Sequence, residues 1–463
     1  MRSLRPSLWL LPWLVACADP GSTPPVTPPN LVLLTLDTLR TDHVGGYGYP
    51  RDTTPNLDAL MDEALVFDRC FAPIAHTTPS HLSLLTGVYP HEHGVLSNAN
   101  LKPASVQQAQ AFRSTPSLKS FAQHARQRGY ATGGFVSAAP LKAITGLSLG
   151  FQEWSEPESA RRTATETLAE AHAWLDQQSA GKPWFLWVHL FDAHGPYVRG
   201  QQPPAPYDGL FEADEALRAR LDRMGFSPEL RGRQVGKTTA VEVVNLYDGS
   251  VRWLDDQLAP LFERLRDRAD WTRTAVVVVG DHGQGLGQHD YLAHGVVWDE
   301  QLAVPLIMRL PGHAPARIPH LLSTVDVLPT VLAQLPGLAD QEFVEQFHGT
   351  NALAAGIRPP VFGMSPPKRG LTMLRGARWK IVRGNEGDEL YDLGADPYEQ
   401  MNVAADHPDE LARQAQALDA FMLQQLLRGE QQANLRQGSQ VGGPDAEHLR
   451  EMRELGYAGE DED

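Results

Sequence analysis

The feature that most constrains the fold of this chain is a series of short, continuously apolar runs separated by longer amphipathic segments. The first run covers residues 30–36 and is followed by Asp37; similar runs lie at 131–136, 184–190, 274–279 and 305–308. Uninterrupted apolar runs of this length are typical of strands buried on both faces. Segments with helical periodicity separate them, at about 53–63, 117–128, 159–177 and 241–265. The alternation predicts an α/β fold with a doubly wound, mostly parallel sheet and helices on both faces.

Changes in composition and in hydrophobic pattern divide the chain into five segments. We interpret residues 1–16 as a signal peptide, 17–29 as a Pro-rich linker and 30–345 as a catalytic domain. From about residue 340 the segments become short and rich in turns, which predicts a small α+β subdomain over 346–430 with antiparallel strands and a packing helix near 408–428. Residues 431–463 form an acidic C-terminal tail, in which we expect a short, solvated helix.

The N-terminal segment predicts export and a lipid anchor. Two arginines precede an apolar stretch over 8–16, which is too short to span a bilayer but suits a signal peptide. The stretch ends in Leu-Val-Ala-Cys17, which resembles the lipobox of bacterial lipoproteins, where cleavage precedes a lipidated Cys. A plain secretory signal cut near Ala18 is the alternative. We therefore expect an exported protein of the bacterial cell envelope, in the periplasm or on the outer surface, held to a membrane through Cys17.

The net charge of the chain argues against nucleic acid as a partner. The chain has 40 basic and 56 acidic side chains, for a net charge of −16. A protein this acidic is a poor general nucleic-acid binder, because such binders need basic patches that displace counterions from phosphates. An anionic substrate would have to be attracted by a local device such as a metal ion.

Two of the apolar runs end in groups that bind metals. Asp37 follows the first run, and Asp281 and His282 follow the run at 274–279 after Gly280. Because ligands bind at the carboxyl ends of strands in open parallel sheets, we expect these side chains to converge on one edge. Each acid alone could simply cap a helix. The pair on matching strand ends, with His289 and His294 further along, favours a metal site.

A third motif predicts a helix N-terminus suited to anions. Thr77 and Thr78 precede Pro79 in the sequence TTPSHLSLLTG, and Pro is favoured at the first position of a helix, so we expect the helix to begin at Pro79. The exposed N–H groups and the positive end of the helix dipole attract anions there. A hydroxyl at this position could attack phosphorus or sulfur if a metal lowered its pKa. Capping alone is the structural alternative.

Together these motifs resemble the sulfatase family of the alkaline-phosphatase-like superfamily. The segment 77–87 is similar to the sulfatase signature, and residues 36–43 and 281–289 are similar to the two metal loops of the family. Residues 191–197 (FDAHGPY) resemble its His-x-Pro-Tyr segment. Further segments that resemble family motifs follow in the family's order at 304–307, 326–330 and 389–393. The resemblance covers residues 30 to about 405. It implies an alkaline-phosphatase-like fold, a metal held by Asp37, Asp281, His282 and Thr77, and ester hydrolysis.

Several positions depart from the family pattern. Thr77 stands where sulfatases have a Cys or Ser that is oxidised to formylglycine, and Thr is not a substrate for that maturation. The resemblance is therefore to phosphodiesterase-like and phosphoglycerol-transferase-like relatives, in which an unmodified Thr attacks directly. His81 replaces the signature Arg and stays among our candidate catalytic residues, with Thr77, His194 and His294. Thr38 replaces the second Asp of the first metal loop, and Ser137 lies where a Lys is expected.

These departures bear on the metal. Imidazole from His282 among carboxylates favours Mn or Zn over Ca, although Ca stays an option for an oxygen-rich site. We expect one tightly held divalent ion. A second ion could be held by Asp192, His194 and His294, but we prefer to interpret the two histidines as substrate contacts or leaving-group acids. His189, inside an apolar run, is interpreted as a satisfied core histidine, and Arg40 and Asp42 as support for the ligands.

The sequence thus predicts a metal-dependent hydrolase that cleaves an anionic ester of a small molecule or glycan through Thr77. A phosphate mono- or diester is favoured over a sulfate ester, because a threonyl sulfate cannot be released by collapse of a hemiacetal as formylglycine sulfate is. The alternatives are a sulfuric ester hydrolase proper, a phosphoglycerol or phosphoethanolamine transferase, and a non-catalytic envelope binding protein.

Overall fold

The structure is a computed structural model. It describes residues 28–98, 111–200, 202–212, 215–226, 234–235, 238–335, 337–338, 340–356, 358–436 and 446–455. The predicted signal peptide, Cys17 and nearly all of the Pro-rich linker lie outside the described residues.

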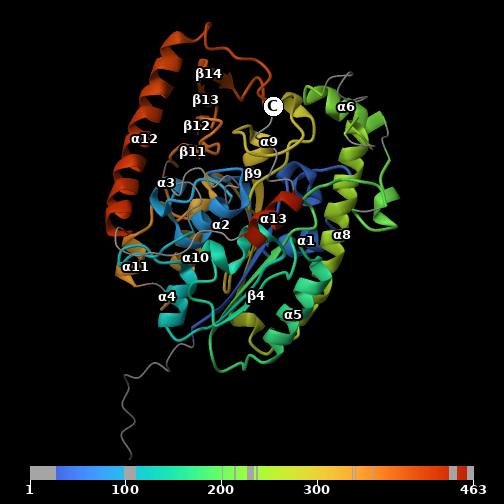
Figure 1. The fold of residues 1–463 in the computed structure, drawn as a ribbon, viewed down its shortest axis with the longest axis vertical. Helices are drawn as coiled ribbons and strands as arrows, with labels where there is room; N and C mark the ends of the chain where they lie inside the picture. Colours follow the sequence, from blue (N-terminus) through green and yellow to red (C-terminus); the bar gives the residue numbers. More distant parts are fainter. Residues whose placement is uncertain are drawn as a thin grey trace, which may run out of the picture.

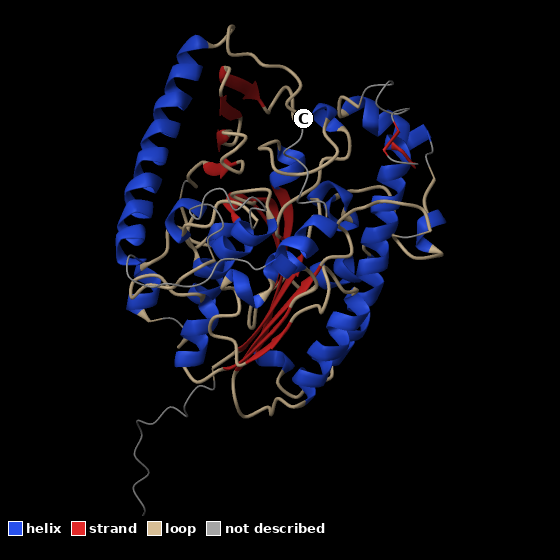
Figure 2. Cartoon of the chain, viewed as in Figure 1, coloured by secondary structure: helices blue, strands red, loops and turns tan. Residues whose placement is uncertain are grey.

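The predicted α/β fold is confirmed. An eight-stranded sheet forms the centre of the molecule, and helices cover both of its faces (Figure 2). Its strands, in spatial order, are β10 (Ala316–Ser323), β2 (Leu65–Phe71), β9 (Ala303–Arg309), β8 (Thr274–Gly280), β1 (Asn30–Leu36), β5 (Trp184–Leu190), β3 (Ala131–Phe135) and β4 (Glu153–Ser155). Only β9 is antiparallel to its neighbours β2 and β8. The sheet is therefore mostly parallel, and the run at 305–308 is its reversed strand.

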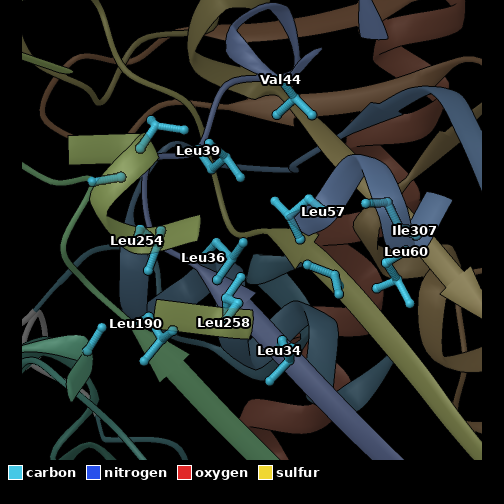
Figure 3. Close-up of a cluster of buried hydrophobic side chains, with 14 of the residues drawn as sticks. Leu34, Leu36, Leu39, Val44, Leu57, Leu60, Leu190, Leu254, Leu258 and Ile307 are labelled. Atoms are coloured by element: carbon cyan, nitrogen blue, oxygen red, sulfur yellow. The ribbon is translucent and has the colours of Figure 1, made fainter. Parts of the chain in front are cut away.

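The central strand β1 shows why a continuous apolar run was needed. Alternate side chains of a strand point to opposite faces. Val32, Leu34 and Leu36 pack with α1 (Pro55–Met61), α5 (Ala164–Asp176) and α8 (Ala240–Arg266), as Figure 3 shows in part. Leu31 and Leu33 pack on the other face with α2 (Thr77–Thr86), α4 (Phe121–Gln127) and α10 (Val327–Gln334). Burial of each such side chain contributes about 1.5–3 kcal/mol, so the strand is held rigidly from both sides.

Capping boxes determine where three of the helices begin. Ser120, Thr163 and Thr239 each accept a hydrogen bond from the backbone N–H three residues later, at the start of α4, α5 and α8. The sequence analysis began α4 and α5 several residues too early, because apolar periodicity continues into the preceding loop whereas the cap sets the first turn.

Three strands of the eight-stranded sheet were not predicted from the sequence, and neither was the separate two-stranded sheet of β6 (Gln234–Val235) and β7 (Thr238–Thr239). The strand β2 carries Asp68 and Arg69 in its middle, and β10, at the sheet edge, is exposed over its first residues and contains Pro319. Edge and near-edge strands need not be apolar on both faces, so the search for continuous apolar runs does not find them. The third missed strand, β4, has only three residues at the opposite edge.

A second, smaller sheet follows, as predicted for the C-terminal region. It consists of four antiparallel strands, β11 (Val361–Met364), β12 (Thr372–Arg375), β13 (Trp379–Gly384) and β14 (Gly387–Asp392). The helix α12 (Pro408–Arg436) packs beside them and is longer than the predicted helix (Figure 1). A parallel bridge from Ile74 to Met364 connects this sheet to the segment that leads into α2.

The last described helix, α13 (Ala446–Glu454), corrects the expectation of a solvated helix. Met452 and Leu455 are buried against Ala138, Ala139 and Phe191, which follow β3 and β5. The Glu451 carboxylate accepts a hydrogen bond from Lys142 Nζ at 2.5 Å. The helix therefore lies over the carboxyl edge of the sheet, because one of its faces is apolar although its sequence is mostly charged.

Within the described part of the chain, no helix combines the length and the apolarity that a membrane crossing requires.

Candidate metal centre and active site

The register of the sheet brings Asp37 and Asp281 together. The strands β1 and β8 are adjacent and parallel, with Leu36 opposite Gly280, so the residue after each strand emerges at the same point of the edge. The backbone N–H of Asp37 donates to the Leu190 carbonyl on β5. The two acids therefore converge on one edge, as the strand-end argument predicts, and both carboxylates are buried.

Each carboxylate keeps one oxygen for a cation. Asp281 Oδ1 accepts hydrogen bonds from the N–H groups of Thr38 (3.1 Å) and His282 (2.7 Å), while its Oδ2 has no hydrogen-bond partner. Asp37 Oδ2 lies 3.2 Å from His189 Nε2, and its Oδ1 has no partner. Leaving a buried carboxylate oxygen without a donor is costly, and a metal ion removes that cost.

His282 directs a ring nitrogen to the same place. Its Nδ1–H donates to the Gly283 carbonyl (2.9 Å), which leaves Nε2 as the unprotonated nitrogen. This Nε2 lies 3.4 Å from Asp281 Oδ2 and 3.4 Å from the Thr77 hydroxyl oxygen. Ligand atoms of Asp37, Asp281 and His282 all lie within 4.8 Å of one another. Two carboxylate oxygens, an imidazole nitrogen and an adjacent hydroxyl form a donor set that fits a divalent cation.

Electrostatics support the same conclusion. Burial raises the pKa of Asp37 to about 7, and the pKa of Asp281 is raised by burial and then by the charge of Asp37. Two buried carboxylates this close do not both ionise cheaply in the protein alone. A bound divalent cation would balance their charge and hold both in the ionised form.

Thr77 is the first residue of α2, which begins two residues before the predicted start at Pro79. All ten residues of this helix are buried, and its start is fixed by contacts on two sides. Ser80 Oγ donates to the Asp281 carbonyl (2.6 Å), and Thr78 Oγ1 donates to the Pro140 carbonyl (2.7 Å). The helix N-terminus therefore points at the cation site, with Thr77 between the two. His81, one turn later, donates from Nδ1 to the Thr77 carbonyl (2.8 Å) and lies 3.6 Å from Asp281.

His189 is part of the site, which the sequence interpretation did not foresee. It is fully buried and satisfied, as predicted, but one of its partners is the Asp37 carboxylate. Its Nδ1 accepts from the Ser137 N–H (3.3 Å), so Nε2 carries the proton and donates to Asp37. His189 thus orients a metal ligand. A signal was present, because a lone imidazole is the penultimate residue of the strand that lies beside the one preceding Asp37.

His194, His294 and His76 line the outer part of the site. His194 donates from Nδ1 to the Gly195 carbonyl (2.9 Å) and His294 from Nδ1 to the Ala75 carbonyl (2.8 Å). Their Nε2 atoms face each other at 3.3 Å, and the ring of His294 lies 4.5 Å from that of His282 and 5.6 Å from that of His76. His76, which lies just before α2, was not among the site residues predicted from the sequence.

The structure does not bring Asp192 together with these histidines. Asp192 Oδ1 accepts from the Ala164 N–H (3.1 Å) and from Trp253 Nε1 (3.2 Å), on α5 and α8. In the described chain the three metal-binding groups that converge are Asp37, Asp281 and His282, and Asp192 forms no such group with His194 and His294. Among the described residues, the optional second ion therefore has no assembled donor set. The interpretation of the two histidines as substrate contacts or leaving-group acids stays a prediction.

The support predicted for Arg40 and Asp42 is present. Arg40 binds the Asp42 carboxylate through two hydrogen bonds of 2.8 Å and also donates to the Gln284 carbonyl (2.9 Å). It thereby ties the loop after β1 to the loop after β8. His289, in contrast, turns away from the cation site and binds Glu300 at 3.0 Å.

The fold and the family comparison together place the chain among the ester-cleaving hydrolases of the alkaline-phosphatase-like superfamily. The sulfatase family model matches residues 29–338, and the chain belongs to this family. Ulvan-active sulfatase of Formosa agariphila is 24% identical over 426 residues, which cover 84% of this chain and 80% of that protein.

Solved structures give the same fold. A putative sulfatase from Bacteroides thetaiotaomicron superposes with a TM-score of 0.67 at 20% identity, covering 91% of this chain and 96% of that one. The phosphonate monoester hydrolase of Agrobacterium radiobacter superposes with a TM-score of 0.65 at 22% identity, covering 86% and 96%.

Proposed function

We propose that this protein is a metal-dependent hydrolase that cleaves an anionic phosphoester, in preference to a sulfate ester, with Thr77 as the nucleophile. One observation carries the proposal: unpartnered oxygens of Asp37 and Asp281 meet His282 Nε2 beside the Thr77 hydroxyl, at the start of a buried helix. A non-catalytic binding protein would have no need of a hydroxyl between a cation site and a helix N-terminus.

Asp37, Asp281, His282 and Thr77 would hold one divalent ion, Mn or Zn by preference because of the imidazole ligand. When bound, the ion supplies Lewis-acid polarisation of the ester and lowers the pKa of the Thr77 hydroxyl. The chain itself supplies the rest. The N-terminus of α2 attracts the anionic ester, and buried Asp281 and Pro140, through Ser80 and Thr78, fix the direction of Thr77.

In this mechanism the Thr77 hydroxyl releases its proton to solvent and its oxygen attacks phosphorus in line, so that a P–O bond to Thr77 forms as the P–O bond to the leaving alkoxide breaks. Water then hydrolyses the threonyl phosphate. The leaving alkoxide needs a proton. Because the Nδ1–H groups of His194 and His294 are committed to carbonyls, their Nε2 atoms, 3.3 Å apart, are the positions through which a proton would reach it. His81 and His189 lie behind Thr77 and Asp37 and position them.

Sulfate hydrolysis is the second candidate, because the relatives named above include sulfatases. A phosphonate monoester hydrolase with this fold shows that phosphorus chemistry also occurs on it. The unmodified Thr77 favours phosphorus, since a threonyl sulfate must be released by attack of water at sulfur.

The test compares matched aryl phosphate monoester, phosphodiester and sulfate ester substrates, with metal content measured on the same preparation. We expect one Mn or Zn per chain, a higher kcat/KM on a phosphoester, and equal activity with or without co-expressed formylglycine-generating enzyme. Faster sulfate hydrolysis, or dependence on that enzyme, would overturn the assignment. No turnover of any ester would favour a binding protein.

We also propose that the mature protein is anchored in the bacterial envelope through a lipid on Cys17. The sequence at 14–17 supports this. Replacing Cys17→Ser should move the protein from the membrane fraction to the soluble fraction; a wild-type protein already soluble would contradict the anchor.

A further inference from the structure

The exposure of the site residues shows where the leaving group must lie. Asp37, Thr77 and His282 are 0% exposed, whereas His194 and His294 are 7% exposed and His76 is half-buried. We call Asp37, Thr77, Asp281 and His282 the floor, and His76, His194 and His294 the mouth. Because the reacting ester must reach Thr77 on the floor, the rest of the substrate extends through the mouth.

Two arginines lie at the mouth, each against the glycine that follows one of the paired histidines. Arg161 donates from Nη1 to the Gly195 carbonyl (3.4 Å), directly after His194. A Cβ placed on Gly295, directly after His294, would lie 3.7 Å from Arg369 Nε and 3.2 Å from His76 Nε2. The two guanidinium groups therefore approach the histidine pair from its two chain segments.

Arg369 comes from the loop between β11 and β12, in the C-terminal subdomain. It donates to the Tyr291 hydroxyl, and its guanidinium carbon lies 4.9 Å from the centre of the Tyr291 ring. The Tyr291 hydroxyl in turn donates to the His294 carbonyl (3.1 Å). The positive charge of Arg369 also lowers the pKa of His76, after the larger effects of burial and of His282. Arg369 is thus held in place beside the mouth by the segment that carries His294.

The proposed chemistry on the floor does not use the charges at the mouth, because a bound divalent cation would balance Asp37 and Asp281. Arg161 also donates to Gln202 Oε1 (2.5 Å), and it forms no ion pair with any carboxylate among the described residues. Asp192 raises the pKa of Arg161, against the larger effect of burial. In a chain of net charge −16, the placement of two guanidinium groups beside the histidine pair favours an anionic group in the part of the substrate that lies there.

We propose that the leaving group of the substrate carries its own negative charge, a carboxylate, sulfate or phosphate, which Arg161 and Arg369 bind. This inference deepens the proposed function and rests on it. The substrate is then an ester with at least two anionic groups: one reacts on the floor, and the other orients the substrate at the mouth through charge-assisted hydrogen bonds.

The experiment compares an aryl ester with the same ester carrying a carboxylate on its ring. The metal-loaded full-length protein is assayed on both, using the ester class that it hydrolyses faster. We expect wild type to prefer the carboxylated ester by roughly tenfold or more in kcat/KM, mainly through KM, with the preference decreasing at high salt. The double variant Arg161→Gln/Arg369→Gln should reduce the preference to about twofold or less while retaining kcat on the uncharged aryl ester.

A matched control is Arg378→Gln, which removes the same charge from the same subdomain. Arg378 is 63% exposed and pairs with Asp392 (2.7 Å). This variant should keep the wild-type preference. Equal kcat/KM of wild type on the two esters, or equal loss on both in the double variant, would overturn the proposal.

A binding measurement separates this proposal from the proposed function. Calorimetry with the two product phenols, one carboxylated and one not, needs no turnover. Tighter binding of the carboxylated phenol by wild type, lost in the double variant and kept in Arg378→Gln, supports the anion site even if neither ester is hydrolysed. Equal binding of the two phenols overturns it.

Discussion

The floor and the mouth of the site are built in different ways. Floor residues follow directly from β1, β8 and the start of α2, and their positions are set by backbone register inside a core packed on both sides. The mouth residues lie in loops, with His194 after β5, His294 after β8 and His76 before α2, and Arg369 of the C-terminal subdomain lies against Gly295. The proposed reaction therefore depends on sheet geometry, whereas the proposed choice of substrate depends on loops and on a segment docked from the C-terminal subdomain.

The sharpest test of the floor is Thr77→Ala. We expect kcat/KM to fall by roughly 10³-fold or more, because the covalent step loses its nucleophile. Thr78→Ala is the matched control. It removes the bond to Pro140 but leaves the nucleophile, and should cost far less. Steady-state kinetics with metal content determined for each variant measure this. Residual activity of Thr77→Ala near that of Thr78→Ala would show that another group attacks.

A second test of the floor is Asp281→Asn. The change leaves Oδ1 to accept from Thr38 and His282 but removes the charge that faces the cation site. Metal titration monitored by calorimetry should show a loss of affinity of at least about 100-fold, larger than the loss expected from positioning residues. Unchanged metal affinity would mean that the ion binds elsewhere.

His189→Phe tests the layer behind the floor. The variant keeps the ring volume but removes the donor to Asp37 Oδ2. Loss of such an orienting partner typically costs 10–100-fold in metal affinity or activity, so we expect a decrease of about 10-fold. Urea unfolding of the metal-free variant is the control, since a collapse of the core would lower metal affinity for an unrelated reason. A fully active variant with unchanged metal affinity would show that His189 only fills the core and does not position Asp37.

Asp192, beneath the mouth, gives the smallest effect and a distinct pH signature. Burial raises its pKa to about 6, although the Ala164 and Trp253 donors oppose this. Because the folded-state pKa lies above the ordinary Asp value of about 3.9, its stabilising contribution is complete below that pH and is lost as pH rises through about 6. The loss amounts to about 2–3 kcal/mol by linkage.

Asp192→Asn removes this titration. Its free energy of unfolding, relative to wild type, should therefore increase between about pH 4 and pH 8, as measured by urea unfolding. Metal content should stay at one ion per chain. Two ions per chain in wild type and one in Asp192→Asn would instead support a second metal site that includes Asp192.

Much of the fold and floor could be predicted from the sequence, because local patterns encode them. Apolar runs place Asp37, Asp281 and His282 at strand ends, and the Thr-Thr-Pro start places Thr77. The direction of β9 could not be read, since an apolar run does not specify its orientation. Arg369 reaches the mouth, and Met452 reaches Phe191, only through docking between distant segments, which no local periodicity records.

The position of α13 has a consequence for truncation. The floor residues come from the eight-stranded sheet and the start of α2, whereas the helix that covers Phe191 follows all of β11–β14 and α12. A chain that stops after Arg436 keeps every proposed metal ligand but loses the helix that packs on Phe191, whose ring stacks on that of His194. We expect such a chain to bind metal normally while selecting substrates less strictly.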